Sequence, residues 1–194
     1  MKYSDLDPLK KIYFTVNDLS DALNIRVESA RVLCSRYVKK GIFIRLKKGF
    51  YILASKWEYL TLENFYKISN FLQVPSYISF MSALSRYEVT TQVQRNFFES
   101  ASLKRTKHIE VKDVTFNFYK LNKKYYFDFL KEGHFFIATM EKALLDSLYL
   151  YSFGKYKIDI NSIDFDKFDN NKIKQMLDIY PPKTAKTVRK LCGI

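Results

Sequence analysis

The chain has 194 residues, of which 47% are hydrophobic and 17% aromatic, so it can form one large domain or two small ones with packed cores. Its net charge of +13 favours an anionic partner, although abundant lysine is also typical of proteins from AT-rich genomes. We expect a cytoplasmic protein, because no apolar run approaches the roughly 18 residues that span a bilayer and residues 1–11 lack a secretory signal. Cys34 and Cys192 have no metal-ligand neighbours and are not expected to form a structural disulfide.

Positive charge is densest at the amino-terminal end of the chain. Residues 1–56 contain 12 Lys and Arg against 5 Asp and Glu, a net charge of +7. Residues 57–194 contain 21 against 15, a net charge of +6 over a much longer segment. The amino-terminal part is therefore the better candidate for contact with an anionic polymer.

Two short helices are predicted before residue 25. Apolar residues between Leu6 and Tyr13 indicate the first. Thr15 and Asp18 have the spacing of a capping box, which predicts that the second begins directly after Thr15.

Residues 26–40 are predicted to form the helix around which this part of the chain is organised. Gly41 follows two lysines, which is typical of a helix end. The face opposite the apolar residues carries Glu28, Arg31, Val32, Ser35, Arg36 and Lys39. The apolar residues have the i, i+3, i+4, i+7 spacing of one buried face, and they are Ala30, Leu33, Cys34 and Tyr37.

Residues 42–53 predict a tight β-hairpin. The runs IFIRL and FYIL are rich in β-branched and aromatic residues, and Lys47, Lys48 and Gly49 separate them, with the glycine suited to a left-handed turn position. The order helix, turn, helix, hairpin is that of a winged helix-turn-helix, so we predict such a DNA-binding domain over residues 1–56.

The predicted DNA contacts come from the helix over residues 26–40 and from the hairpin. Arg31 and Arg36 are expected at base edges or phosphates, because a guanidinium group matches the acceptors of guanine and of phosphate. The hairpin cations are expected at the DNA backbone or minor groove. The alternatives are a solvated helix face and an edge strand protected by charge. The full predicted set is Ser29, Arg31, Ser35, Arg36, Lys39, Arg45, Lys47 and Lys48.

After the predicted winged helix, residues 57–75 are predicted to form a connecting helix and residues 76–194 a mixed α/β domain. The whole chain is therefore predicted to be an α+β protein. Ser79 is expected to cap a short helix that follows it, and Thr139 a long helix that buries one face as far as Tyr151. Strands are predicted at residues 108–111, 114–121 and 135–138, and terminal helices at residues 172–180 and 185–192.

Two further groups of residues have both functional and structural interpretations. A second basic group would extend a DNA footprint, contact a partner protein or RNA, or only solubilise a loop. An aromatic run could stack on bases, but such runs more often belong to a core or a partner surface. The basic group is Arg95, Lys104, Arg105 and Lys107, and the aromatic run is Tyr125, Tyr126, Phe127 and Phe129.

Carboxylates beside a lysine, at Glu141, Lys142 and Asp146, are the arrangement closest to an enzymatic site. The two carboxylates lie about 140° apart around a helix axis, so they do not converge on one metal ion. We expect Glu141 to interact with the helix amino terminus and Asp146 to form a salt bridge. His108 and His134 have no ligand or triad spacing. No enzyme activity, metal or cofactor is therefore expected.

Four segments carry a resemblance to a known family. The chain resembles the AbiEi-type antitoxins of abortive-infection systems, bacterial transcriptional regulators linked to phage defence, and the resemblance covers most of residues 10–150. Members usually have Pro where this chain has Met140, which bears only on how sharply a helix begins. The segments are LKKGFYIL (46–53), PSYISFMSAL (75–84), SLKRTKHIEV (102–111) and ATMEKALLD (138–146).

The resemblance implies a repressor of its own operon that also neutralises a nucleotidyltransferase-like toxin encoded next to it. Such antitoxins are described as type IV, acting without a stable complex with the toxin. The expected partners are that toxin and double-stranded operator DNA, bound as an inverted repeat by two copies, with no membrane partner. The alternatives are a stand-alone regulator whose second domain senses an effector or dimerises, and a nuclease directed by the winged helix.

Overall fold

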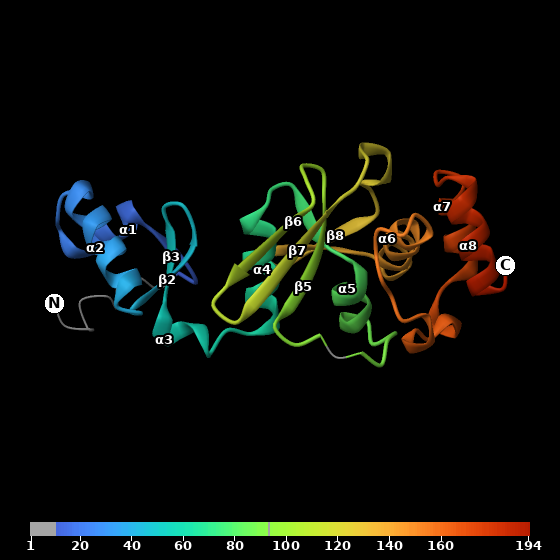
Figure 1. Cartoon of the computed structure of the whole chain (residues 1–194), viewed down its shortest axis with the longest axis horizontal. Coiled ribbons are helices and arrows are strands. Elements are labelled where there is room, and N and C mark those ends of the chain that lie inside the picture. The colour runs from blue at the N-terminus through green and yellow to red at the C-terminus, as the bar shows by residue number, and fades with distance from the viewer. Residues whose placement is uncertain (1–10, 93) are drawn as a thin grey trace. The chain divides into compact units, whose positions relative to one another are not determined.

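The computed structural model describes residues 11–92 and 94–194 of a mixed α+β protein. The chain divides into two compact units, Met1–Phe65 and Tyr66–Ile194, each with its own sheet (Figure 1). Most of the helix predicted near residues 6–13 lies outside the described residues, and residues 11–13 are bends. Within the described ranges, none of the helices combines the length and apolar character needed to cross a bilayer.

The first unit contains a small antiparallel sheet in which β3 lies between β1 and β2. Its core joins the inner face of α2 to the sheet and includes Phe14, Leu19, Cys34 and Phe43. The elements are β1 (Phe14–Thr15), α1 (Val16–Leu23), α2 (Val27–Lys39), β2 (Phe43–Lys47), β3 (Phe50–Leu53) and α3 (Ala54–Trp57).

Local signals in the sequence explain how these elements begin and end. Thr15 Oγ1 accepts a hydrogen bond from the Asp18 amide at 3.1 Å, and Asp18 Oδ2 accepts one from the Thr15 amide at 2.7 Å, so the predicted capping box is confirmed. Gly41, at φ +70°, follows α2 as predicted. Gly49, at φ +78°, forms the turn of the predicted hairpin.

The second unit contains a mixed six-stranded sheet with the order β6-β7-β5-β4-β9-β8. The pairs β5–β7 and β4–β9 are parallel, and the other neighbours are antiparallel. The strands are β4 (Ser76–Ile78), β5 (Phe97–Ser102), β6 (Lys107–Val111), β7 (Val114–Lys120), β8 (Phe129–Glu132) and β9 (Phe135–Ala138). The helices are α4 (Leu62–Leu72), α5 (Phe80–Arg86), α6 (Met140–Ser152), α7 (Asn170–Leu177) and α8 (Pro182–Cys192), with short 3₁₀ turns at Lys123–Tyr125, Ile160–Ser162 and Phe165–Lys167.

Alternating side chains of the central strand β5 show which helix covers which face of the sheet. Ser100 Oγ lies 2.9 Å from Ser69 Oγ of α4. Glu99, on the opposite face, accepts a hydrogen bond from the amide of Met81 in α5. The sheet therefore lies between α4 and the pair α5 and α6, and α7 and α8 pack on α6 (Figure 1).

Several predictions for this unit are confirmed. The predicted strands correspond to β6, β7 and β9, and Thr139 caps α6 by accepting a hydrogen bond from the Lys142 amide at 3.4 Å. The terminal helices correspond to α7 and α8.

Other predictions differ from the structure. Ser79 precedes α5, but its side chain makes no cap hydrogen bond, because its hydroxyl donates to Asp146 at 2.8 Å. Tyr151 is exposed rather than buried. Residues 57–75 contain the end of α3 and the shorter helix α4, and the boundary between the units falls inside α4.

Candidate nucleic-acid interface

Helix α2 has one buried face and one exposed face. Ala30 and Cys34 are fully buried, with Leu33 and Tyr37 packed beside them, as predicted. The exposed face carries Glu28, Ser29, Arg31, Val32, Ser35, Arg36 and Lys39.

Cations from α2 and from the hairpin surround one open hollow of about 760 Å³ in the first unit. Arg31 and Ser35, one helical turn apart, contribute from α2, and Arg45 and Lys48 contribute from the hairpin. This brings together four of the eight predicted contact residues. A surface of this shape and charge suits a phosphate backbone better than a neutral ligand.

The remaining predicted residues lie elsewhere on the first unit. Ser29 and Arg36 line a smaller hollow together with Ile25, Val32 and Leu33. Lys47 is half-buried, with its Nζ 5.2 Å from the centroid of the Phe50 ring. Lys39 is exposed near the end of α2 and lines neither hollow.

The main hollow also has a wall that the sequence analysis missed, the first turn of α1. Thr15, Val16 and Asn17 line it, and the first amides of a helix carry a partial positive charge that favours an anion. The capping box at Thr15 marked this helix end in the sequence, but nothing in the sequence placed it beside the hairpin.

Tyr51 lies at the base of the main hollow. Burial raises the pKa of its hydroxyl, and a thiolate at Cys34 would raise it further, while Arg45 and Arg31 lower it. The hydroxyl therefore stays neutral at physiological pH and keeps the proton that a hydrogen-bond donor needs.

The second basic group does not form a single cluster. Lys104, Arg105 and Lys107 are exposed and follow the carboxyl end of β5, where the Arg105 carbonyl accepts a hydrogen bond from Gln73 Nε2 at 2.8 Å. Arg95 is also exposed but precedes β5, so the length of that strand, roughly 20 Å, separates it from the others. The expected proximity of Arg95 to the three other cations is therefore wrong.

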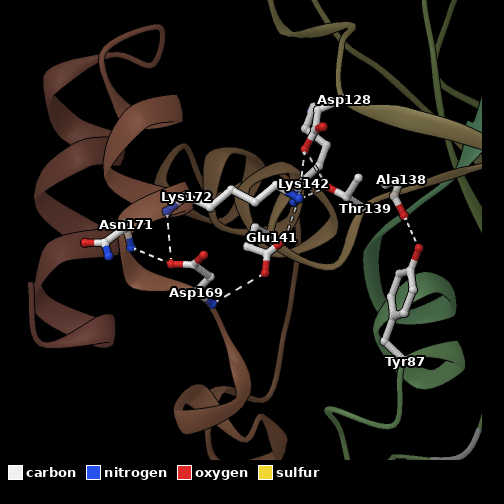
Figure 2. A network of polar contacts seen from close by, with 9 residues as sticks. All are labelled: Tyr87, Asp128, Ala138, Thr139, Glu141, Lys142, Asp169, Asn171 and Lys172. Atoms are coloured by element: carbon white, nitrogen blue, oxygen red, sulfur yellow. Dashed lines mark hydrogen bonds and ion pairs between the residues drawn. The ribbon is translucent and has the colours of Figure 1, made fainter.

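Glu141 belongs to a polar network at the start of α6 (Figure 2). Its Oε2 lies 2.9 Å from Lys172 Nζ, and its Oε1 accepts a hydrogen bond from the Asp169 amide at 3.4 Å. Lys172 also lies 3.7 Å from Asp128, whose carboxylate accepts a hydrogen bond from Thr139. The network joins α7 to α6 and to the segment before β8, which is a structural role.

Asp146 faces a different set of partners inside the unit. It forms an ion pair with Lys142, and both side chains are 0% exposed. Its Oδ2 also accepts hydrogen bonds from Tyr77 and Ser79. The predicted salt bridge is therefore confirmed, and Glu141 and Asp146 do not share a site. In the described part of the chain, no group of three or more His, Cys, Asp or Glu side chains is placed to hold a metal ion.

The aromatic run belongs to the packing of the second unit. Tyr125 is buried and stacks on Tyr180 with a centroid distance of 4.9 Å, and Phe129 stacks on Tyr77 at 4.7 Å. Tyr126 and Phe127 are half-buried. The structure therefore favours the core interpretation over base stacking for this run.

A second hollow, of about 440 Å³, lies on the face of the second unit that carries α5. Glu99 lies at its floor and accepts hydrogen bonds from Tyr156 at 2.8 Å and from Tyr119 at 3.2 Å. Burial raises the pKa of Glu99 to about 7, and the hydrogen bonds oppose that shift. Glu99 could not be identified from the sequence, because its partners lie far from it along the chain.

Comparison of the chain with models of known protein families, with curated proteins and with solved structures finds no match. The motif resemblance to AbiEi-type antitoxins therefore stays a prediction.

Proposed function

We propose that the first unit is a winged helix-turn-helix that binds double-stranded DNA in a sequence-specific manner. The observation that carries the proposal is the shared hollow in which Arg31 and Ser35 of α2 face Arg45 and Lys48 of the hairpin. Helix α1, the turn at Asn24, helix α2 and the β2–β3 hairpin follow one another in the order of that fold.

The two hollows suggest that different residues would contact the bases and the phosphates of DNA. The exposed face of α2 would enter the major groove, which is wide enough for a helix. Arg45, Lys48 and the first turn of α1 would contact phosphates beside it, which orients the protein without specifying sequence. Lys47 contributes positive charge while packing on Phe50.

We further propose that the protein represses its own operon and neutralises a nucleotidyltransferase-like toxin in the cytoplasm, as a type IV antitoxin without catalysis of its own. The antitoxin part of the proposal rests on the four segments that resemble AbiEi-type antitoxins, one in the first unit and three in the second. Within the second unit, the segment ATMEKALLD supplies the first part of α6 and its buried ion pair, so the motif serves the folding of that unit. An exposed group at Lys104, Arg105 and Lys107 offers a surface for toxin or nucleic acid.

Titration of the purified protein against its own upstream DNA and a scrambled duplex, each at two salt concentrations, tests the DNA-binding proposal. Preference for the upstream DNA that survives higher salt supports operator recognition. Arg36→Ala should weaken operator binding and reduce discrimination, whereas Lys48→Ala should weaken binding to both duplexes similarly. Equal, salt-sensitive binding to both duplexes, or wild-type affinity in both variants, would contradict the proposal.

Co-expression with the neighbouring toxin gene tests the antitoxin part. Wild-type protein should restore growth, and Arg36→Ala should restore growth while losing repression of an operon reporter. That outcome would separate the two activities, whereas failure of the wild type to restore growth would leave only a regulator.

The alternative is a stand-alone regulator whose second unit senses an effector or dimerises. The hollow above Glu99 favours the effector version, because a buried carboxyl group with hydroxyl neighbours can bind a small polar ligand. The absence of a nucleotidyltransferase-like reading frame beside the gene would favour this alternative.

A further inference from the structure

Glu28, Val32 and Arg36 form an inclined stripe on the exposed face of α2. They are spaced i, i+4, i+8, and all three are exposed. We propose that this stripe determines base preference, with Val32 contacting a thymine methyl group and Glu28 accepting a hydrogen bond from a cytosine amine. The inference rests on the proposed DNA-binding function and assigns base recognition to residues beyond the cations.

Val32 offers an apolar contact in an otherwise polar surface. Its side chain is 59% exposed, and it lines the smaller hollow with the apolar residues Ile25 and Leu33 and the polar residues Ser29 and Arg36. The thymine methyl is the apolar group that base edges present in the major groove, so it is the natural occupant of such a hollow. Arg36, which lines the same hollow, is then placed for the guanine or phosphate of a neighbouring base pair.

Glu28 is a carboxylate on a face that otherwise carries cations. Among residues 11–92 and 94–194, no side chain forms an ion pair or hydrogen bond with Glu28 or with Arg36. A carboxylate is repelled by phosphates, but it can accept a hydrogen bond from the N4 amine of cytosine in the major groove. Glu28 therefore favours a particular base and opposes non-specific contact at its end of α2.

The spacing of the stripe matches that of stacked base pairs. Residues four apart rise about 6 Å along a helix, close to two base-pair steps of about 3.4 Å each. Arg31 lies on the side of α2 that lines the main hollow with Arg45 and Lys48, so it belongs with the phosphate contacts. The stripe thus provides base recognition, and the residues around the main hollow provide contact with the DNA backbone.

Selection from a random duplex library identifies the preferred sequence of the wild-type protein, and single thymine-to-deoxyuridine replacements then remove one methyl group at a time. Replacement of the one contacted thymine should weaken wild-type binding about fourfold, because one buried methyl group contributes roughly 0.8 kcal/mol and 1.4 kcal/mol is a factor of ten. Val32→Ala, with a shorter apolar side chain, should show a smaller penalty than the wild type. Val74→Ala, at a valine with 56% exposure in the second unit, is the matched control and should keep the wild-type penalty.

Repeating the selection with Glu28→Gln tests the other contact. Gln pairs with adenine N6 and N7, so the preferred base at one position should change from cytosine to adenine. If Val32→Ala keeps the thymine penalty, or Glu28→Gln selects the wild-type sequence, the stripe does not determine preference although the protein still binds specifically. If the wild type enriches no sequence at all, the proposed function itself has failed.

Discussion

The buried pair Lys142 and Asp146 allows a stringent test of how the second unit is stabilised. Both side chains are 0% exposed. Asp146 Oδ2 accepts hydrogen bonds from the hydroxyls of Tyr77 at 2.9 Å and Ser79 at 2.8 Å. Lys142 Nζ donates to Asp146 and, at 3.1 Å, to the Tyr180 hydroxyl. Every charge in this cluster therefore depends on a partner that water cannot replace.

Asp146→Asn removes the negative charge while keeping the side-chain shape. Breaking a buried pair in this way costs about 3–5 kcal/mol of unfolding free energy. In the folded variant, Lys142 can lose its proton instead of remaining an unpaired charge. Neutralising a lysine with an ordinary pKa near 10.4 costs about 4.6 kcal/mol at pH 7, so the unpaired charge cannot cost more than this amount. We therefore expect Asp146→Asn to lose about 3–5 kcal/mol at neutral pH.

The pH dependence of that loss identifies its cause. Burial lowers the pKa of Lys142, and Asp146 opposes the shift, so in Asp146→Asn we expect a neutral Lys142 in the folded state. The unfolded chain keeps this lysine protonated up to about pH 10, so it binds more protons than the folded variant does. The loss of unfolding free energy should therefore shrink as the pH rises above 7, by about 1.4 kcal/mol per pH unit.

Lys142→Met should show the opposite trend. Burial raises the pKa of Asp146, and without Lys142 the folded state holds this carboxyl group protonated while the unfolded state ionises it above about pH 4. The loss in Lys142→Met should therefore shrink as pH falls from 7. The double variant, with both charges removed, should lose less than the sum of the single losses.

Urea unfolding followed by far-ultraviolet circular dichroism at about pH 5.5, 7 and 8.5 measures these free energies, and hydrogen exchange locates the loss in α6. Asp164→Asn is the control, because Asp164 and Lys167 form an exposed pair at 3.7 Å and its loss should cost about 0.5 kcal/mol or less. Losses in the two single variants that run parallel with pH, or that do not exceed the control, would refute the reasoning.

Three further predictions concern single residues. Thr15→Ala removes the capping box of α1 and should cost about 1 kcal/mol, measured as a lower urea midpoint for the emission of Trp57 in the first unit; an unchanged midpoint would contradict this. Gly49→Ala should cost about 1 kcal/mol in the same assay, because a Cβ there meets no atom within 4 Å and only the backbone at φ +78° is strained; wild-type stability would argue against that turn. Glu99 has a folded-state pKa of about 7, which is above its value in the unfolded chain. Its contribution to the unfolding free energy is therefore fully present below about pH 4.5, and about 3 kcal/mol of it is lost as the pH rises to 7. Glu99→Gln should remove that part of the pH dependence, and an unaltered stability profile would show that Glu99 is not protonated in the folded protein.

Elements with local signals were predictable from the sequence. The capping box at Thr15, the cap at Thr139 and the glycines at 41 and 49 act within a few residues of the backbone they control. Those predictions needed no knowledge of the rest of the fold. The alternating strand that begins at Val114 was found for the same reason.

Elements that depend on distant partners were not predictable. Strand β5 contains Glu99 and three small residues, a poor strand pattern, yet it is central because Ser100 bonds to α4 and Glu99 to Tyr156. The spacing predicts a capping role for Ser79, but its hydroxyl donates a hydrogen bond to Asp146, 67 positions away. Sequence spacing cannot show which hydrogen-bonding partner lies closer in the fold.

The individual residues of the candidate site could be predicted from the sequence, but their arrangement in space could not. The sequence identified the exposed face of α2 and the cations of the hairpin. It could not show that Arg31 and Ser35 face the hairpin while Ser29 and Arg36 face away, because that depends on how α2 packs on the sheet. The first turn of α1 joined the site for the same reason.

The two cysteines give each unit its own reporter of opening. Cys34 is buried in the first unit and Cys192 is partly buried in the second, and burial raises the pKa of both thiols to about 11. Because the thiolate is the reactive form, both thiols should react slowly with alkylating reagents while the units stay closed. A short pulse of such a reagent, followed by mass spectrometry, would therefore time the opening of each unit in the unmodified chain.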